Sequence, residues 1–161
     1  MSDISVLFVC LGNICRSPTA HAVFQSMLDA EGLSNRITVD SSGTGDWHIG
    51  RAPDSRSQHH ALDRGYDMSA LRARLVTVDD FAQFDYILAM DNQNLIDLKA
   101  MQPSGFSGEL QLLLNFCQNP DYVNYREVPD PYYSGVQGFA LVLDLIEDAS
   151  RGLLRHIKAR L

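Results

Sequence analysis

Cys10 and Arg16 are the residues of this sequence whose types and spacing first suggest chemistry. Cys10 comes directly after an apolar, β-branched run at residues 4–9, and Arg16 follows it six positions later. Ser17 and Pro18 come next, and proline is common in the first turn of a helix, where its missing N–H is harmless. The segment therefore predicts a loop between a buried strand and a helix, with a thiol at one end and a guanidinium group at the other.

The residues inside this loop favour the binding of an anion. Gly12 and Asn13 accept left-handed backbone angles, which allows the loop to turn successive N–H groups inward as an anion nest. The start of the helix adds the positive end of its dipole, and Arg16 can hold two oxygens of one phosphoryl group. Positive potential around Cys10 favours its ionised thiolate, to which Ser17 could donate its hydroxyl. The loop thus predicts a nucleophile and an oxyanion cradle in one segment.

Other interpretations of these residues fit the sequence less well. A free cysteine after a strand is usually a small buried apolar side chain, but that interpretation leaves the pattern around Cys10 unexplained. No GxxxxGK[ST] phosphate loop occurs, and Cys10 and Cys15 have no second Cys or His pair at the spacing of a metal site. His59 and His60 fall in a helical pattern and are expected on a solvated face. We therefore expect neither a metal nor a cofactor.

Composition indicates one ordinary globular domain over residues 1–161. The chain has 45% hydrophobic and 20% charged residues and a formal net charge of −7. Three cysteines, the third being Cys117, are too few and odd in number for a disulfide framework, so a reducing compartment is expected. The acidic balance disfavours nucleic acid and acidic membranes as partners. Because the first residues show neither a signal peptide nor a membrane span, we expect a cytoplasmic protein.

Apolar patterns along the chain alternate between strand and helix. Strands are predicted at residues 4–9, 37–43, 85–90 and 109–116, and helices at residues 18–31, 54–64, 78–84, 91–101 and 136–161. This alternation predicts an α/β protein: a single-domain, doubly wound, flavodoxin-like sheet of about four parallel strands with helices on both faces. Sites in such sheets lie beyond the carboxyl ends of the strands. The irregular stretches 43–53 and 117–135 follow strands, so we expect both at that end.

The stretch VCLGNICRSPTA, residues 9–20, resembles the active-site loop of the low-molecular-weight protein tyrosine phosphatases, whose pattern is Cys, five residues, Arg and Ser. The stretch DPYY, residues 130–133, resembles the acid-loop motif of that family. The stretches DSSGT (40–44), DWHIGRAPD (46–54) and FDYILAMD (84–91) extend the similarity over nearly the whole chain. The resemblance implies a metal-independent protein tyrosine phosphatase that forms a phosphocysteine intermediate.

The resemblance also implies a role for each residue of the site. Cys10 would attack phosphorus in line, Arg16 and the amides of residues 11–16 would hold the phosphoryl oxygens, and Asp130 would serve as general acid and base. Pro131 restricts the backbone beside Asp130 and helps to aim its carboxyl group. The substrate-binding residues would be Leu11, Gly12, Asn13, Ile14, Cys15, Ser17, Trp47, Tyr132 and Tyr133.

A hydrogen-bond network of Asn13, Ser17 and Ser41 is further implied, and it would hold the loop open. Family members often carry a histidine in this network, but the matching position in this sequence is Leu71. This departure concerns the strength of the network and not the chemistry.

Aromatic residues on the two long irregular stretches indicate the substrate class. Trp47, Tyr132 and Tyr133 would form a deep slot for a phenyl ring, which favours phosphotyrosine over the shorter phosphoserine. A relative of this fold that cleaves phosphoarginine carries threonine where this sequence has Ile14, and an apolar side chain cannot hydrogen-bond a guanidinium group. Arsenate reductases share the loop, but they need redox cysteines between residues 80 and 90, and this sequence has none there.

Two other function classes and one regulatory role stay open. The protein could be a phosphopeptide-binding module without turnover, or an oxidoreductase that uses Cys10 and Cys15. Under oxidant, a disulfide between these two cysteines could also protect the nucleophile of a phosphatase. The expected partners are phosphotyrosine-containing proteins, including by analogy an autophosphorylating tyrosine kinase, with inorganic phosphate as product and inhibitor.

Overall fold

Four parallel strands form a central sheet in the computed structural model, which describes residues 3–131 and 136–161. The strands are β1 (Ile4–Cys10), β2 (Ile37–Gly43), β3 (Tyr86–Ala89) and β4 (Glu109–Leu112). Their order in the sheet is β2-β1-β3-β4, and every neighbouring pair is parallel. The chain therefore winds from β1 to one side and then crosses to the other side. The predicted doubly wound fold is confirmed, and its switch point lies between β1 and β3.

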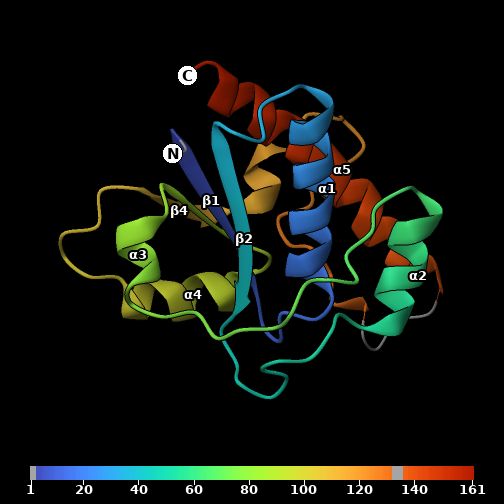
Figure 1. Cartoon of the computed structure of the whole chain (residues 1–161), viewed down its shortest axis with the longest axis horizontal. Coiled ribbons are helices and arrows are strands. Elements are labelled where there is room, and N and C mark those ends of the chain that lie inside the picture. The colour runs from blue at the N-terminus through green and yellow to red at the C-terminus, as the bar shows by residue number, and fades with distance from the viewer. Residues whose placement is uncertain (1–2, 132–135) are drawn as a thin grey trace.

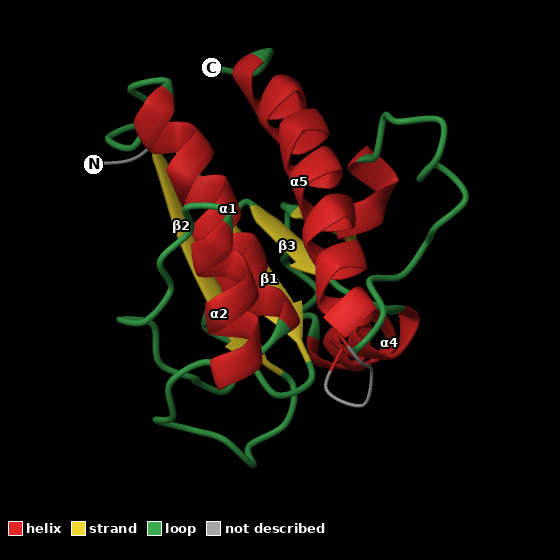
Figure 2. Ribbon diagram, turned by 90° about the vertical axis from the view of Figure 1, so that its right-hand side faces the viewer, coloured by secondary structure: helices red, strands yellow, loops and turns green. Residues whose placement is uncertain are grey.

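Helices cover both faces of this sheet (Figures 1 and 2). One face packs against α1 (Arg16–Ala30), α2 (Ser55–Asp63), α5 (Val136–Lys158) and the short 3-10 helix η1 (Leu113–Phe116). The other face packs against α3 (Asp80–Gln83) and α4 (Asn92–Met101). In the described part of the chain, no helix has the length and apolar character needed to cross a membrane.

Strand β1 is buried on both faces from Val6 to Cys10, which explains its apolar sequence there. Phe8 faces α1 and meets Phe24 edge to face, with ring centroids 5.8 Å apart. Leu7 and Val9 point to the opposite face, where they pack in the cluster that contains Phe81. Because successive side chains of a strand alternate between the faces of a sheet, a central strand needs apolar residues at every position.

The strand predicted at residues 109–116 is only half correct. The strand ends at Leu112, and Leu113–Phe116 form η1 instead. Leu113 and Leu114 are both buried in the cluster beneath α1 and α5, whereas adjacent residues of a strand would point to opposite faces. Helix α3 is also shorter than the helix predicted at residues 78–84, and α1 begins two residues earlier than predicted.

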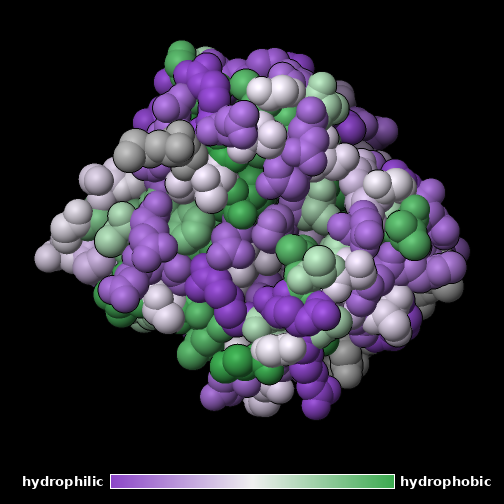
Figure 3. All heavy atoms as spheres, viewed as in Figure 1, coloured by the Kyte–Doolittle hydropathy of each residue, from purple (hydrophilic) through white to green (hydrophobic). Residues whose placement is uncertain are grey.

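The loops that follow β1 and β2 lie together at the carboxyl end of the sheet, at the bottom of Figure 1. The start of β1 and the end of α5 lie at the opposite end. Figure 3, drawn in the same view as Figure 1, shows a largely hydrophilic face with hydrophobic side chains in small separated groups.

Candidate active site

The loop from Leu11 to Cys15 is held from outside by its carbonyl groups. Thr44 N–H donates to the carbonyl of Cys10 at 2.9 Å, Gly45 N–H to that of Leu11 at 2.8 Å, and Asp54 N–H to that of Ile14 at 2.8 Å. In a trans peptide, the N–H of the next residue points opposite to the carbonyl, and the described chain has no cis peptide. The N–H groups that follow these carbonyls are therefore turned toward the inside of the loop.

Asn13 is the residue of this loop with a left-handed backbone, at φ 57°. Its side chain bridges two segments, because Nδ2 donates to Ser17 Oγ at 2.7 Å and Oδ1 accepts from Arg74 N–H at 2.9 Å. Gly12 was expected to share the left-handed conformation, but its φ is not positive. Its small size is used for a close approach instead, since a Cβ at Gly12 would lie 3.0 Å from the ring of His48.

Gly43 was not predicted as part of the site, yet it lies against the back of the loop. A Cβ at this position would lie 2.7 Å from the carbonyl oxygen of Leu11 and 3.1 Å from the amide nitrogen of Asn13. The end of β2 therefore supports the loop only because residue 43 has no side chain. The DSSGT stretch contained this signal, as a glycine within a strand often marks a close backbone approach.

Cys10 lies at the floor of the loop and is 2% exposed. Its Sγ accepts from the amide of Asn13 at 3.2 Å and lies 3.1 Å from Ser17 Oγ. Ser17 Oγ also lies 3.2 Å from the carbonyl of Ser42, to which it can donate. The sulfur thus accepts from the amide of Asn13 and lies beside the hydroxyl of Ser17, whose one proton can go either to the sulfur or to the carbonyl of Ser42.

Arg16 begins α1 and is held by groups from two distant segments, one at Asp91 and the other at residues 128–130. Its Nη1 donates to Asp91 Oδ2 at 2.7 Å and to the carbonyl of Val128 at 3.1 Å, and its Nη2 lies 3.8 Å from Asp130 Oδ2. Burial alone would lower the pKa of Arg16, but Cys10, Asp91 and Asp130 together raise it above its ordinary value. The guanidinium group is therefore both buried and permanently charged.

Asp91 is a second residue that the sequence analysis missed as part of the site. It lies two residues after the end of β3 at the switch point, where its Oδ1 accepts from Asn94 N–H in a capping box at the start of α4. Its other carboxylate oxygen holds Arg16. The capping pattern was readable from the sequence, but the partner of the second oxygen depends on the crossover that brings β3 beside β1.

A pocket of about 410 Å³ opens above the loop. Trp47 and His48 form part of its wall, and the indole of Trp47 is 64% exposed. His48 was not predicted as a lining residue. Tyr132 and Tyr133 lie outside the described residues. The predicted site residues that line the pocket are Cys10, Leu11, Gly12, Ile14, Cys15, Arg16, Trp47 and Asp130.

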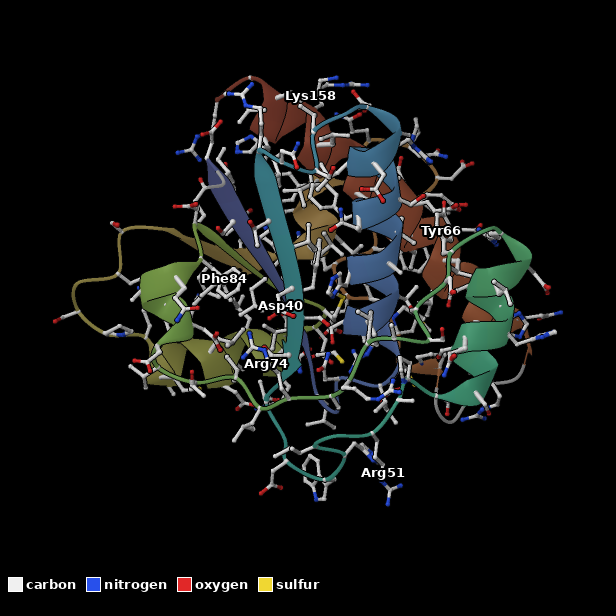
Figure 4. All side chains as sticks on the ribbon, viewed as in Figure 1. Asp40, Arg51, Tyr66, Arg74, Phe84 and Lys158 are labelled. Atoms are coloured by element: carbon white, nitrogen blue, oxygen red, sulfur yellow. The ribbon has the colours of Figure 1, made fainter. Side chains whose placement is uncertain are left out.

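Arg74 fixes the segment whose amide holds Asn13. Its guanidinium group contacts Asp80 through two nitrogens at 3.0 and 3.1 Å and Asp40 at 3.1 Å, and Figure 4 shows Arg74 near Asp40 of β2. Burial acts to lower the pKa of Arg74, but Asp80 and Asp40 raise it above the usual range. The charge of Arg74 thus joins α3 and β2 to the segment behind the loop.

Ser41 lies beside a residue outside the network predicted for it. The hydroxyl of Ser41 lies 3.3 Å from Nδ1 of His21, whereas Asn13 and Ser17 contact each other directly.

Burial raises the pKa of Cys15 to about 12, with a smaller contribution from the carboxylate of Asp54. Cys15 is therefore a neutral thiol in this arrangement.

Comparisons with known proteins agree with the geometry of the pocket. Residues 5–161 match a family model described as low molecular weight phosphotyrosine protein phosphatase. A putative low molecular weight protein-tyrosine-phosphatase of Synechocystis sp. is 43% identical over 155 residues, which cover 96% of both chains. A crystal structure of a protein tyrosine phosphatase from Entamoeba histolytica, with Hepes in its active site, has a TM-score of 0.91 at 39% identity, covering 98% of this chain and 99% of that one. The chain is also similar to the crystal structure of a Drosophila arginine phosphatase, with a TM-score of 0.87 at 32% identity over 95% of this chain and 97% of that one.

Proposed function

Because this chain belongs to the low molecular weight phosphotyrosine protein phosphatase family, we propose that it hydrolyses phosphotyrosine in proteins through a cysteinyl-phosphate intermediate. The observation that supports the mechanism is a single pocket in which Cys10 and Arg16, from one short segment, lie together with Asp130 from a distant part of the chain. Phosphate monoester hydrolysis needs a nucleophile, positive groups around the equatorial oxygens and a proton for the leaving oxygen. These three residues supply one requirement each.

In the first step, the Cys10 thiolate attacks phosphorus while the bond from phosphorus to the tyrosine oxygen breaks. The buried guanidinium of Arg16 and the inward amides of the loop stabilise the charge on the three equatorial oxygens. The protonated carboxyl of Asp130 gives its proton to the leaving phenolate oxygen, so that neutral tyrosine departs. The phosphoryl group is then bound to Cys10 Sγ.

In the second step, a water molecule attacks phosphorus and the bond from phosphorus to Cys10 Sγ breaks. The carboxylate of Asp130 takes a proton from this water, which restores the acid for the next cycle. The sulfur leaves as a thiolate, and Ser17 Oγ, 3.1 Å from Sγ, can donate a hydrogen bond to it. The products are tyrosine and inorganic phosphate.

The substrate is proposed to be phosphotyrosine because the thiol lies beneath a walled pocket. Cys10 is almost fully buried, and Trp47 offers an aromatic face at the mouth on which a phenyl ring can stack. Phosphoserine is too short to place its phosphorus at that depth. Phosphoarginine is disfavoured by the apolar Ile14 in the lining, since a guanidinium group needs a hydrogen-bond acceptor.

The mechanism is tested by turnover of a phosphotyrosine peptide and of an aryl phosphate in the presence of a metal chelator. Cys10→Ser is expected to have no detectable turnover, and Asp130→Ala to lose about 10²- to 10⁴-fold in rate, in line with general-acid contributions. Cys117→Ser and Asp121→Ala serve as matched controls that retain activity, because neither residue lines the pocket. Turnover by Cys10→Ser, or a requirement for added metal, contradicts the proposal.

The same assay, given phosphoserine and phosphoarginine peptides, separates the substrate classes. Faster turnover of phosphoarginine would instead place this chain functionally with the arginine phosphatase it resembles. Binding of a phosphotyrosine peptide without release of phosphate would favour a phosphopeptide-binding module, and thiol-dependent reduction of arsenate would favour an oxidoreductase.

Two partner assignments belong to the same proposal. Inorganic phosphate is the product and carries the same oxygens as the bound phosphoryl group, so it is expected to inhibit competitively. An autophosphorylating tyrosine kinase is proposed as a physiological substrate by analogy with bacterial members of the family. Capture of phosphoproteins by Asp130→Ala, followed by mass spectrometry, tests this assignment, and a captured set without such a kinase contradicts it.

A further inference from the structure

His21 lies one helical turn after Ser17 on α1, and both side chains face the carboxyl end of β2. Ser17 Oγ lies 3.2 Å from the carbonyl oxygen of Ser42, and His21 Nδ1 lies 3.3 Å from the hydroxyl of Ser41. Residues four positions apart share one face of a helix, so these two contacts join successive turns of α1 to β2. Figure 1 shows α1 running alongside β2 over this region.

Both contacts are made to the part of β2 that supports the catalytic loop. Ser41 and Ser42 immediately precede Gly43, which lies against the backbone of Leu11 and Asn13. Ser17 is also in contact with Cys10 Sγ. A shift of α1 relative to β2 would therefore move the hydroxyl beside the sulfur with respect to the strand that carries the loop.

We propose that His21 is a positioning residue for the reaction, which acts through Ser41 to hold the first two turns of α1 in register with the end of β2. His21 touches neither the pocket nor Cys10, so its effect on catalysis is indirect. The inference rests on the phosphatase function proposed above and assigns to that site a residue that supports it from behind.

The surroundings of His21 favour this role over an exposed surface role. His21 and Leu71 line the same cavity of about 250 Å³, and the side chain at position 71 is apolar and offers no hydrogen bond to Ser41. The imidazole of His21 thus contacts Ser41 from α1. The family resemblance, in contrast, led us to expect a histidine at position 71. Burial lowers the pKa of His21 despite the opposing effect of Asp40, so the ring is a neutral hydrogen-bonding group at neutral pH.

The test compares His21→Ala, His21→Asn and Gln25→Ala in turnover of a phosphotyrosine peptide. Asparagine places a polar atom close to the position of Nδ1, and Gln25 lines the same cavity without contacting Ser41. His21→Ala is expected to lose about three- to tenfold in both kcat and kcat/KM, the effect of one hydrogen bond that matters in the transition state. His21→Asn and Gln25→Ala are expected to remain within about twofold of the wild type.

A double-mutant cycle with Ser41→Ala isolates the contact itself. If His21 acts through Ser41, His21→Ala in the Ser41→Ala background has little further effect, whereas independent roles would make the two losses multiply. Unfolding midpoints show whether each variant is folded at the assay temperature. If His21→Ala is not folded, the asparagine variant and Ser41→Ala carry the comparison.

The outcomes separate this inference from the proposed function. An inactive wild type contradicts the phosphatase proposal. An active wild type with an unaffected His21→Ala, an asparagine variant as impaired as the alanine variant, or multiplicative losses in the cycle each overturn the role of His21. Affinity for inorganic phosphate, measured by calorimetry, provides a readout without turnover, and it is expected to weaken in His21→Ala and to recover in His21→Asn.

Discussion

At the scale of single residues, the two thiols at the ends of the β1–α1 loop lie in different surroundings although both are buried. The sulfur of Cys10 is next to the amide of Asn13 and the hydroxyl of Ser17. Cys15 lies near the carboxylate of Asp54, and its pKa is raised to about 12 chiefly by burial. Since only the thiolate is a good nucleophile, the two cysteines are expected to differ strongly in reactivity.

Iodoacetamide at neutral pH is therefore expected to modify Cys10 and to leave Cys15 intact in the folded protein. Peptide mass mapping after a timed reaction measures both sites. The control is the same reaction in denaturant, where all three cysteines become modified. Equal labelling of Cys15 and Cys10 in the folded protein would contradict this expectation.

The raised pKa of Cys15 also bears on the proposed redox role. A Cys10–Cys15 disulfide formed under peroxide requires the Cys15 thiol to lose its proton, which its buried position opposes. We retain the disulfide as a proposal. Recovery of activity with thiol, together with a Cys10–Cys15 linkage in mass maps of peroxide-treated protein, would support it, and the absence of both would exclude it.

Asp91 has two functions that a substitution can separate: its charge holds Arg16, and its second oxygen caps α4. Asp91→Asn keeps an oxygen to cap α4 but removes the charge that faces Arg16. The loss of one charge-assisted hydrogen bond is expected to lower kcat/KM by about 10- to 100-fold. Asp97→Asn, on the same helix and away from Arg16, is the control that retains activity. Unchanged kinetics in Asp91→Asn would mean that Asp130 and Val128 alone orient Arg16.

At the scale of elements, the site depends on how closely the end of β2 approaches the loop after β1. Gly43→Ala would place a Cβ 2.7 Å from the carbonyl oxygen of Leu11, so the backbone must move. We expect a loss of about 1–3 kcal/mol in the free energy of unfolding. A displaced loop is also expected to cost about tenfold or more in kcat.

The matched control is Gly105→Ala, because nothing lies within 4 Å of a Cβ at that position. It is expected to change the free energy of unfolding by no more than about 0.5 kcal/mol. Urea unfolding and peptide turnover measure both variants. A Gly43→Ala protein as stable and active as Gly105→Ala would show that the loop tolerates a wider separation from β2.

Site residues that lie close together in the sequence could be predicted, whereas contacts between distant segments could not. Cys10, Asn13, Arg16 and Ser17 fall within one short segment, so their residue types and spacing already indicated an anion cradle. The partner of Arg16 at Asp91 is 75 positions away, and the amide of Arg74 that holds Asn13 is 61 positions away. Such pairings follow from strand order and crossovers, which periodicity alone does not determine.

At the scale of the whole molecule, the alternation of strand-like and helical segments along the chain predicted the parallel sheet correctly, although β2 and β4 also contain polar residues. The error at residues 109–116 arose where an apolar run continues from β4 into η1 without a turn residue. Packing beneath α1 and α5 decides the conformation there, and a hydrophobic run of that length is compatible with either strand or helix.

Stability as a function of pH is a property of the whole fold to which His21 contributes with a definite sign. Its pKa in the folded protein is lowered below 6.5 by burial, so protonation favours the unfolded chain. The contribution of His21 is complete above its unfolded pKa and is lost as the pH falls through the folded value. Between about pH 7 and pH 5, urea unfolding of wild type is expected to show a steeper loss than that of His21→Asn. Equal slopes would contradict a half-buried, neutral imidazole at His21.

Strand β1 starts and helix α5 stops at one end of the molecule, and the loop that follows β1 lies at the other (Figures 1 and 4). A fusion partner or surface linkage attached through either terminus would thus anchor the molecule by its far side. Immobilised in this way, the protein turns the mouth of its pocket toward the solution, where even a bulky phosphorylated protein has unobstructed access.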